Sequence, residues 1–134
     1  MRALSRVVIG LIAALHLYIA WFEIFAWTSR GPRVFPTLPP ELFEPTVAMA
    51  ANQGVYNAFL AAGLLWSLFV ADPRWRDRIA LCFLGFVAVA GIAGAVTIAP
   101  RILLVQTVPA LVGMVLVVLA GRRDGRDRGV RTLS

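Results

Sequence analysis

The chain has 134 residues, of which 60% are hydrophobic and 15% charged, and its formal net charge is +6. A soluble domain carries about 25% charged residues, so this composition argues against an ordinary soluble protein. The basic residues are all arginines, and they cluster at the ends of long apolar runs rather than along one helix face. This pattern opposes nucleic-acid binding and predicts a polytopic membrane protein.

Four apolar segments are long enough to cross a lipid bilayer. A hydrocarbon core of about 30 Å needs about 20 helical residues, and the four segments cover residues 4–27, 45–71, 79–99 and 102–120. The first is too long for the core of a secretory signal, so we expect it to be retained. The sequence therefore predicts an all-α, four-helix transmembrane bundle at residues 1–121 and a disordered, Arg-rich tail at 122–134.

The connections between these segments differ in kind. Residues 28–44 contain four prolines, which exclude a continuous helix, and their apolar residues predict a loop packed on the bundle or lying in the interface. Residues 72–78 are expected to form a tight polar turn, and residues 100–101 a hairpin. The glycines of the third segment would let a neighbouring helix approach closely.

The arginine distribution predicts the orientation. The N-terminus, residues 72–78 and the C-terminal tail together carry ten arginines, whereas the other two connections carry three. By the positive-inside rule, both termini are expected in the cytoplasm and the Pro-rich loop outside. We therefore expect a multi-pass protein of a bacterial inner membrane.

Two ionisable residues lie within the first apolar segment. His16 and Glu23 are seven residues apart, almost two helical turns, so their side chains share a face. An ionisable group at membrane depth costs several kcal/mol (about 2.5–3.5 on insertion scales) and marks a functional site by default. About 10 Å of helical rise separates the two, so we expect them at the two ends of one pocket.

Further polar side chains are expected in the same outer half of the bundle. Measured along the helices from their outer ends, Glu23 should lie about 6 Å deep, Gln106 about 6–7 Å, and His16 and Asn57 about 16–18 Å. The residues of the second segment pair four apart, Asn52 with Tyr56 and Gln53 with Asn57. The predicted site in the outer half of the bundle comprises His16, Glu23, Asn52, Gln53, Tyr56, Asn57 and Gln106.

Simpler interpretations stay open for each of these residues. Asn, Gln and Tyr often only join membrane helices by hydrogen bonds, worth about 0.6–2 kcal/mol each. Glu23 could pair with Arg30 or Arg33, and His16 could be a satisfied core histidine. No catalytic or metal signature is present, so we expect no metal and no cofactor, and we expect Cys82 to be a small buried residue.

Two stretches, residues 16–27 (HLYIAWFEIFAW) and 50–66 (AANQGVYNAFLAAGLLW), resemble a bacterial family of small integral membrane proteins. That family is catalogued as domain of unknown function 1304. The resemblance covers about residues 4–120. It implies four transmembrane helices and no particular activity.

The leading hypothesis is a cofactor-independent enzyme that isomerises, cyclises or opens an epoxide of a small lipophilic molecule. An apolar surrounding favours the neutral forms of both ionisable groups, so Glu23 would donate a proton and His16 would accept one. The substrate would contact Tyr18, Trp21, Asn52, Gln53, Tyr56, Asn57 and Gln106. The alternatives are a binding or proton-coupled transport protein, for which a homo-oligomer is expected, and an accessory membrane subunit.

Overall fold

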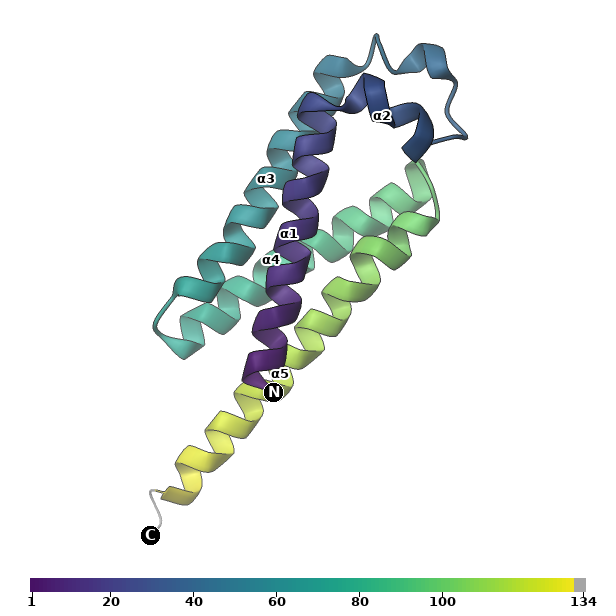
Figure 1. Cartoon of the computed structure of the whole chain (residues 1–134). Coiled ribbons are helices and arrows are strands. Elements are labelled where there is room, and N and C mark those ends of the chain that lie inside the picture. Colours follow the sequence, from purple (N-terminus) through teal and green to yellow (C-terminus); the bar gives the residue numbers. More distant parts are fainter. Residues whose placement is uncertain (132–134) are drawn as a thin grey trace. The chain divides into compact units, whose positions relative to one another are not determined.

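The computed structural model describes the backbone of residues 1–131 and the side chains of residues 1–123. Within these residues the chain is helical and contains no strand, which confirms the predicted all-α fold (Figure 1). The elements in chain order are α1 (Arg2–Phe25), α2 (Trp27–Val34), the 3-10 helix η1 (Pro40–Leu42), α3 (Val47–Phe69), α4 (Pro73–Thr97), the π-helix η2 (Leu103–Thr107) and α5 (Val108–Arg131).

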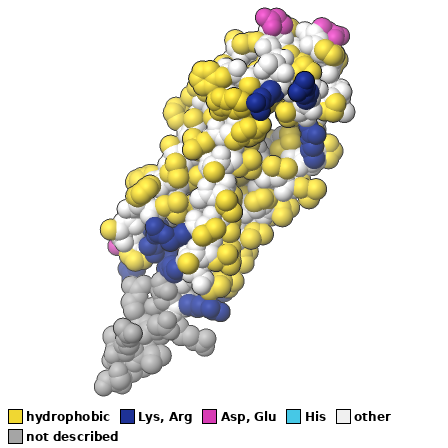
Figure 2. All heavy atoms as spheres, in the orientation of Figure 1, with side chains coloured by type: hydrophobic (Ala, Val, Ile, Leu, Met, Phe, Trp, Pro, Cys, Tyr) yellow, Lys and Arg dark blue, Asp and Glu magenta, His cyan; other side chains and the backbone are white. Residues whose placement is uncertain are grey.

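Three helical segments of the described chain are long and apolar enough to cross a membrane, namely Arg2–Phe25, Pro73–Thr97 and Leu103–Arg123. They correspond to the first, third and fourth predicted spans. Much of the face seen in Figure 2 is covered by hydrophobic side chains, as expected for helices in contact with lipid. Helix α3 has 23 residues but is interrupted by polar side chains, so the second predicted span, at residues 45–71, stays a prediction.

By its internal packing the chain divides into two compact units. The first comprises Met1–Ile12 and Gly63–Ser134, and the second Ala13–Ala62. Helix α5 continues to Arg131, beyond the predicted end of the last span at residue 120, and residues 132–134 lie outside the described chain. A single domain over residues 1–121 with a disordered tail at 122–134 stays a prediction.

In the first unit, α4 packs tightly against η2 and α5. Thr107 donates a hydrogen bond from Oγ1 to the carbonyl oxygen of Ala88 at 3.1 Å. This approach depends on Gly91, because a Cβ there would overlap Oγ1 of Thr107 and lie 2.9 Å from its main-chain nitrogen. The predicted close approach at a glycine of the third segment is therefore confirmed at Gly91, whereas Gly85 has nothing within 4 Å of such a Cβ.

The π-helix η2 has a local cause in the sequence. Pro109 has no N–H and its ring clashes with the carbonyl four residues earlier, so the α-helical bond to Val105 cannot form. The N–H of Val108 instead bonds to the carbonyl oxygen of Leu103, five residues back. The wider turn carries the chain into α5 without breaking it.

The connection before α4 is shorter than predicted. Residues 73–78 were expected in a polar turn, but α4 begins at Pro73. The reason is an Asp-Pro helix start, in which the Asp72 carboxylate accepts a hydrogen bond from the N–H of Trp75 at 2.8 Å and Pro73 occupies the first turn.

Cys82 is exposed, so its prediction as a buried residue is wrong. The buried face of α4 includes Leu84, Val87 and Gly91. Cys82 lies two residues before Leu84, about 200° around the helix, and therefore projects from the opposite side. Helical position rather than apolar character decides its exposure.

In the second unit, aromatic side chains hold the Pro-rich connection together. The Trp27 ring lies 5.7 Å from that of Phe22, 5.9 Å from Phe35 and 5.2 Å from Phe43, measured between centroids. Its Nε1 also donates a hydrogen bond to Oγ1 of Thr46 at 2.9 Å. Residues 28–44 thus form two short helices and packed turns, which confirms that the prolines exclude a continuous helix.

The two glycines of α4 give a matched test of this packing. We expect Gly91→Ala to lower the free energy of unfolding in detergent by about 1–2 kcal/mol, because the main chain at Thr107 cannot yield to an added methyl. Gly85→Ala should be neutral or stabilising by up to about 1 kcal/mol, since alanine favours helix and meets nothing there. Equal effects of the two substitutions would contradict the close approach at Gly91.

The start of α4 predicts a pH dependence. The hydrogen bond from the N–H of Trp75 holds the pKa of Asp72 below its usual range. The stabilisation by this carboxylate is therefore complete above about pH 4, the ordinary aspartate pKa, and is lost as the pH falls through the lower folded pKa. We expect Asp72→Ala to lower the thermal midpoint at neutral pH and the difference from wild type to shrink in acid. A difference that does not change with pH would contradict this role.

Candidate functional site

The candidate site is a hydrogen bond between α1 and α3 in the second unit. Asn57 donates from Nδ2 to Oε2 of Glu23 at 2.8 Å, and the same nitrogen lies 3.3 Å from the carbonyl oxygen of Gln53. Asn57 is buried, with 9% of its surface exposed, and Glu23 is half-buried. The carboxylate is thus held on one side by a buried neutral amide.

Gly54 brings the two helices close enough for this bond. A Cβ at Gly54 would lie 3.0 Å from the carbonyl oxygen of Ala20 and 3.2 Å from Cβ of Glu23. Asn57 follows three residues later on the same face of α3, so its amide reaches the carboxylate. Gly54 was not among the residues predicted for the site, although its position one turn before Asn57 is the signal that identifies it.

The predicted depths of Glu23 and Asn57 are wrong. They were placed about 10 Å apart along the membrane normal, yet their side chains bond directly. The estimate assumed that both helices end at one level. Glu23 lies two residues from the end of α1, whereas Gly54 beside it lies seven residues from the start of α3, so α3 extends about 7 Å beyond the end of α1.

Glu23 does not pair with the nearby arginines. The guanidinium carbon of Arg30 lies over the Trp21 ring, 5.0 Å from its centroid. In the described part of the chain, neither Arg30 nor Arg33 forms an ion pair with Glu23. Its carboxyl group therefore interacts with an amide rather than with a cation, which distinguishes this contact from a structural salt bridge.

His16 is fully buried, with 0% of its surface exposed. It precedes Glu23 by seven residues on α1, so it lies on the same side of the helix, about 10 Å along the axis. This separation is too long for a direct hydrogen bond between the two side chains. The assignment of His16 as a base stays a prediction.

The side chains of the other predicted residues of the second unit take no part in the bond. Tyr18, Trp21 and Tyr56 are 49%, 41% and 56% exposed, and Asn52 and Gln53 are also exposed. The buried positions of α3 include Ala50, Gly54, Asn57, Ala61 and Leu64, spaced three or four apart. Of the four polar residues predicted for this helix, only Asn57 falls on that face.

Gln106 belongs to the first unit. It lies in η2, is half-buried, and its Cβ is 3.0 Å from the position of a Cβ added at Gly91. The structure therefore places it against α4. Its contribution to the site formed by α1 and α3 stays a prediction.

Residues 10–118 match the family described as "Protein of unknown function (DUF1304)". The chain belongs to this family. It is also similar to the "Uncharacterized protein YpaA" of Lactococcus lactis subsp. lactis (strain IL1403), with 28% identity over 112 residues, which cover 81% of this chain and 92% of that protein. No solved structure matches the chain.

A double-mutant cycle tests the bond between α1 and α3. We expect Glu23→Ala and Asn57→Ala to be coupled by about 0.6–1.7 kcal/mol, the range measured for hydrogen bonds between membrane helices. The free energies would be measured by unfolding in mixed detergent micelles. Asn52→Ala serves as a control, because Asn52 is exposed and should show no coupling to Glu23. A coupling of zero for the first pair would contradict the contact.

Proposed function

We propose that this protein is an integral membrane enzyme that moves a proton on a small lipophilic molecule, without a cofactor. The observation that carries the proposal is the 2.8 Å hydrogen bond from the buried Asn57 to Glu23, formed without a neutralising arginine. Glu23 would transfer the proton and Asn57 would fix the carboxyl group. His16 would accept or return a proton at the deeper end of the site.

The chemistry of this pair supports proton transfer. A carboxyl group without a cationic partner raises the free energy of membrane insertion of an apolar segment by several kcal/mol (about 2.5–3.5). A residue with this cost is expected to have a function. Glu23 is only half-buried, and a substrate would reach its carboxyl group from the exposed side of the residue. Isomerisation, cyclisation and epoxide opening each need a positioned acid or base in apolar surroundings and no redox step.

The remaining predicted residues would bind the substrate. Tyr18 and Trp21 are in ring contact on α1, with centroids 5.8 Å apart, and offer an aromatic surface to a lipophilic molecule. The polar side chains of Asn52, Gln53 and Tyr56 on α3 would recognise its polar atoms.

We also propose that α3 completes a bundle of four spans. At 1.5 Å per residue its 23 residues extend about 34 Å, enough for the hydrocarbon core. The surplus of arginines at the N-terminus, between α3 and α4, and in the tail would place these segments in the cytoplasm. The Pro-rich connection would then face outward from a bacterial inner membrane.

A carrier of hydrophobic molecules is the second candidate. It is favoured by the exposed Asn52, Gln53 and Tyr56, because polar side chains at membrane depth need a partner other than lipid. A second copy of the chain would cover them and create a shared pathway. In that case Glu23 would relay protons during transport.

Comparative analysis of lipophilic metabolites tests the enzyme. Cells lacking the gene should accumulate a compound that differs from its product by isomerism or by one water. Wild type should restore the product, whereas Glu23→Gln should reduce turnover at least about 100-fold, since loss of a general acid or base costs about 10²–10⁴. Glu44→Gln, in the exposed connection, is the matched control and should restore the product.

Glutamine retains an acceptor for Asn57, so Glu23→Gln should reach the membrane at wild-type levels. Restoration of the product by Glu23→Gln would contradict the proton-transfer role. A compound that changes only its distribution between cells and medium, together with an oligomer in mild detergent, would favour the carrier instead.

A further inference from the structure

The helix ends of the first unit carry a strong excess of positive charge. The N-terminus, the start of α4 and residues 121–123 of α5 contain seven arginines and two aspartates, a balance of +5. Figure 2 shows a group of arginine side chains near the lower end of the face in view. The connection at residues 27–46 in the second unit has two arginines and two glutamates and no such excess.

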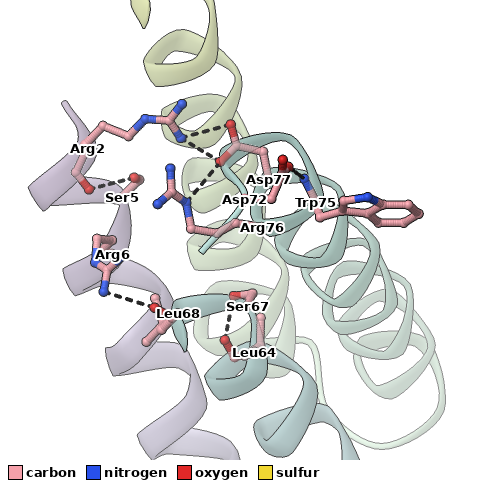
Figure 3. Close-up of polar contacts among 10 residues, drawn as sticks. All are labelled: Arg2, Ser5, Arg6, Leu64, Ser67, Leu68, Asp72, Trp75, Arg76 and Asp77. Carbon is pink, nitrogen blue, oxygen red and sulfur yellow. Dashed lines mark hydrogen bonds and ion pairs between the residues drawn. The ribbon is translucent and has the colours of Figure 1, made fainter. Parts of the chain in front are cut away.

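Both aspartates of this charged end already have partners within it (Figure 3). Asp77 accepts two hydrogen bonds from Nη1 of Arg2, at 2.6 and 2.9 Å, and lies 3.6 Å from Nε of Arg76. Asp72 accepts from the main-chain N–H of Trp75. Asp77 therefore compensates Arg2 and Arg76, while Asp72 is engaged in starting α4.

Arg74 and Arg78 lie outside this network. They are exposed and lie one turn apart on α4. The carboxylate of Asp72 interacts electrostatically with both guanidinium groups. Like charges four residues apart repel each other, and cations at the start of a helix also oppose its dipole. The position is unfavourable for two arginines unless an additional anion lies near them.

Trp75 lies between these arginines in sequence and is 59% exposed. The guanidinium carbon of Arg78 lies 5.4 Å from the centroid of its ring. An exposed tryptophan at the end of an apolar helix is typical of the head-group region of a bilayer. Guanidinium groups bind phosphate oxygens in a bidentate manner, so the surface combines a phosphate ligand with an interfacial anchor.

We infer that Arg74, Trp75 and Arg78 bind the head groups of anionic phospholipids in the membrane that contains the protein. The phosphate would contact the two guanidinium groups, and the indole would lie among the glycerol and upper acyl groups. Arg2 and Arg76 are not part of this lipid-binding surface, because Asp77 forms ion pairs with both of them. The inference does not depend on the proposed reaction at Glu23.

Binding of phosphatidylglycerol and phosphatidylcholine to the full chain in detergent micelles tests the inference. We expect tighter binding of phosphatidylglycerol, and the double substitution Arg74→Gln and Arg78→Gln should weaken it about 25-fold, or about fivefold per arginine. The matched control is Arg30→Gln with Arg33→Gln, because Arg30 also lies over a tryptophan ring but in a segment of balanced charge. This control should leave phosphatidylglycerol binding unchanged.

Inorganic phosphate separates a lipid surface from a general anion site. At millimolar concentration it should not displace phosphatidylglycerol, since it lacks the apolar part that Trp75 would contact. Equal binding of the two lipids, full competition by phosphate, or equal losses in both double variants would each overturn the inference. Circular dichroism of the variants checks that exposed substitutions leave the helices intact.

Discussion

The second unit depends on one constraint, namely that a carboxyl group within an apolar helix must be satisfied by the protein itself. Asn57 meets this need with a 2.8 Å hydrogen bond, and the bond requires α1 and α3 to approach at Gly54. A larger residue at position 54 would separate the helices and leave both polar groups without their partner. The glycine, the amide and the carboxyl group therefore form one structural feature, although Glu23 is distant in sequence from Gly54 and Asn57. The aromatic cluster around Trp27 joins the next segment of the chain to this pair through Phe22 of α1 and Thr46 before α3.

The same constraint acts in the first unit by different means. Thr107 satisfies its hydroxyl group with the carbonyl oxygen of Ala88, and this again requires a glycine, Gly91, in the facing helix. At the charged end, Arg6 donates to the carbonyl oxygen of Leu68 at 3.0 Å, which satisfies a carbonyl group of the last turn of α3. The buried hydroxyl group of Ser67 donates to the carbonyl oxygen of Leu64 at 2.6 Å. In these contacts polar side chains bond to the backbone of an apolar helix. This explains how so apolar a chain holds buried polar residues.

The sequence predicted the helices well, because length, apolar composition and proline are strong local signals. It placed the starts of α1 and α3 within two residues and that of η2, which leads into α5, within one residue. It missed the early start of α4, because Asp72 and Pro73 were interpreted as a turn rather than as a helix start. The site was harder, because which face of α3 meets α1 depends on packing. The buried face is marked by small residues and one amide spaced three or four apart, namely Ala50, Gly54, Asn57 and Ala61. The polar residues between them predict a broader polar face than the one that meets α1. Depths counted from predicted ends failed for Glu23 and Asn57 because the two helices do not end at one level.

The identity of the partner of Glu23 bears directly on what this carboxyl group can do. An arginine partner would favour the charged form alone, and protonation would break the ion pair. An amide N–H can donate to a carboxylate oxygen and equally to the carbonyl oxygen of a neutral carboxyl group. The contact between α1 and α3 can therefore survive a change in the protonation of Glu23. A proton could be gained or lost there without disturbing the packing at Gly54, which a repeated proton-transfer reaction requires and which a purely structural contact does not.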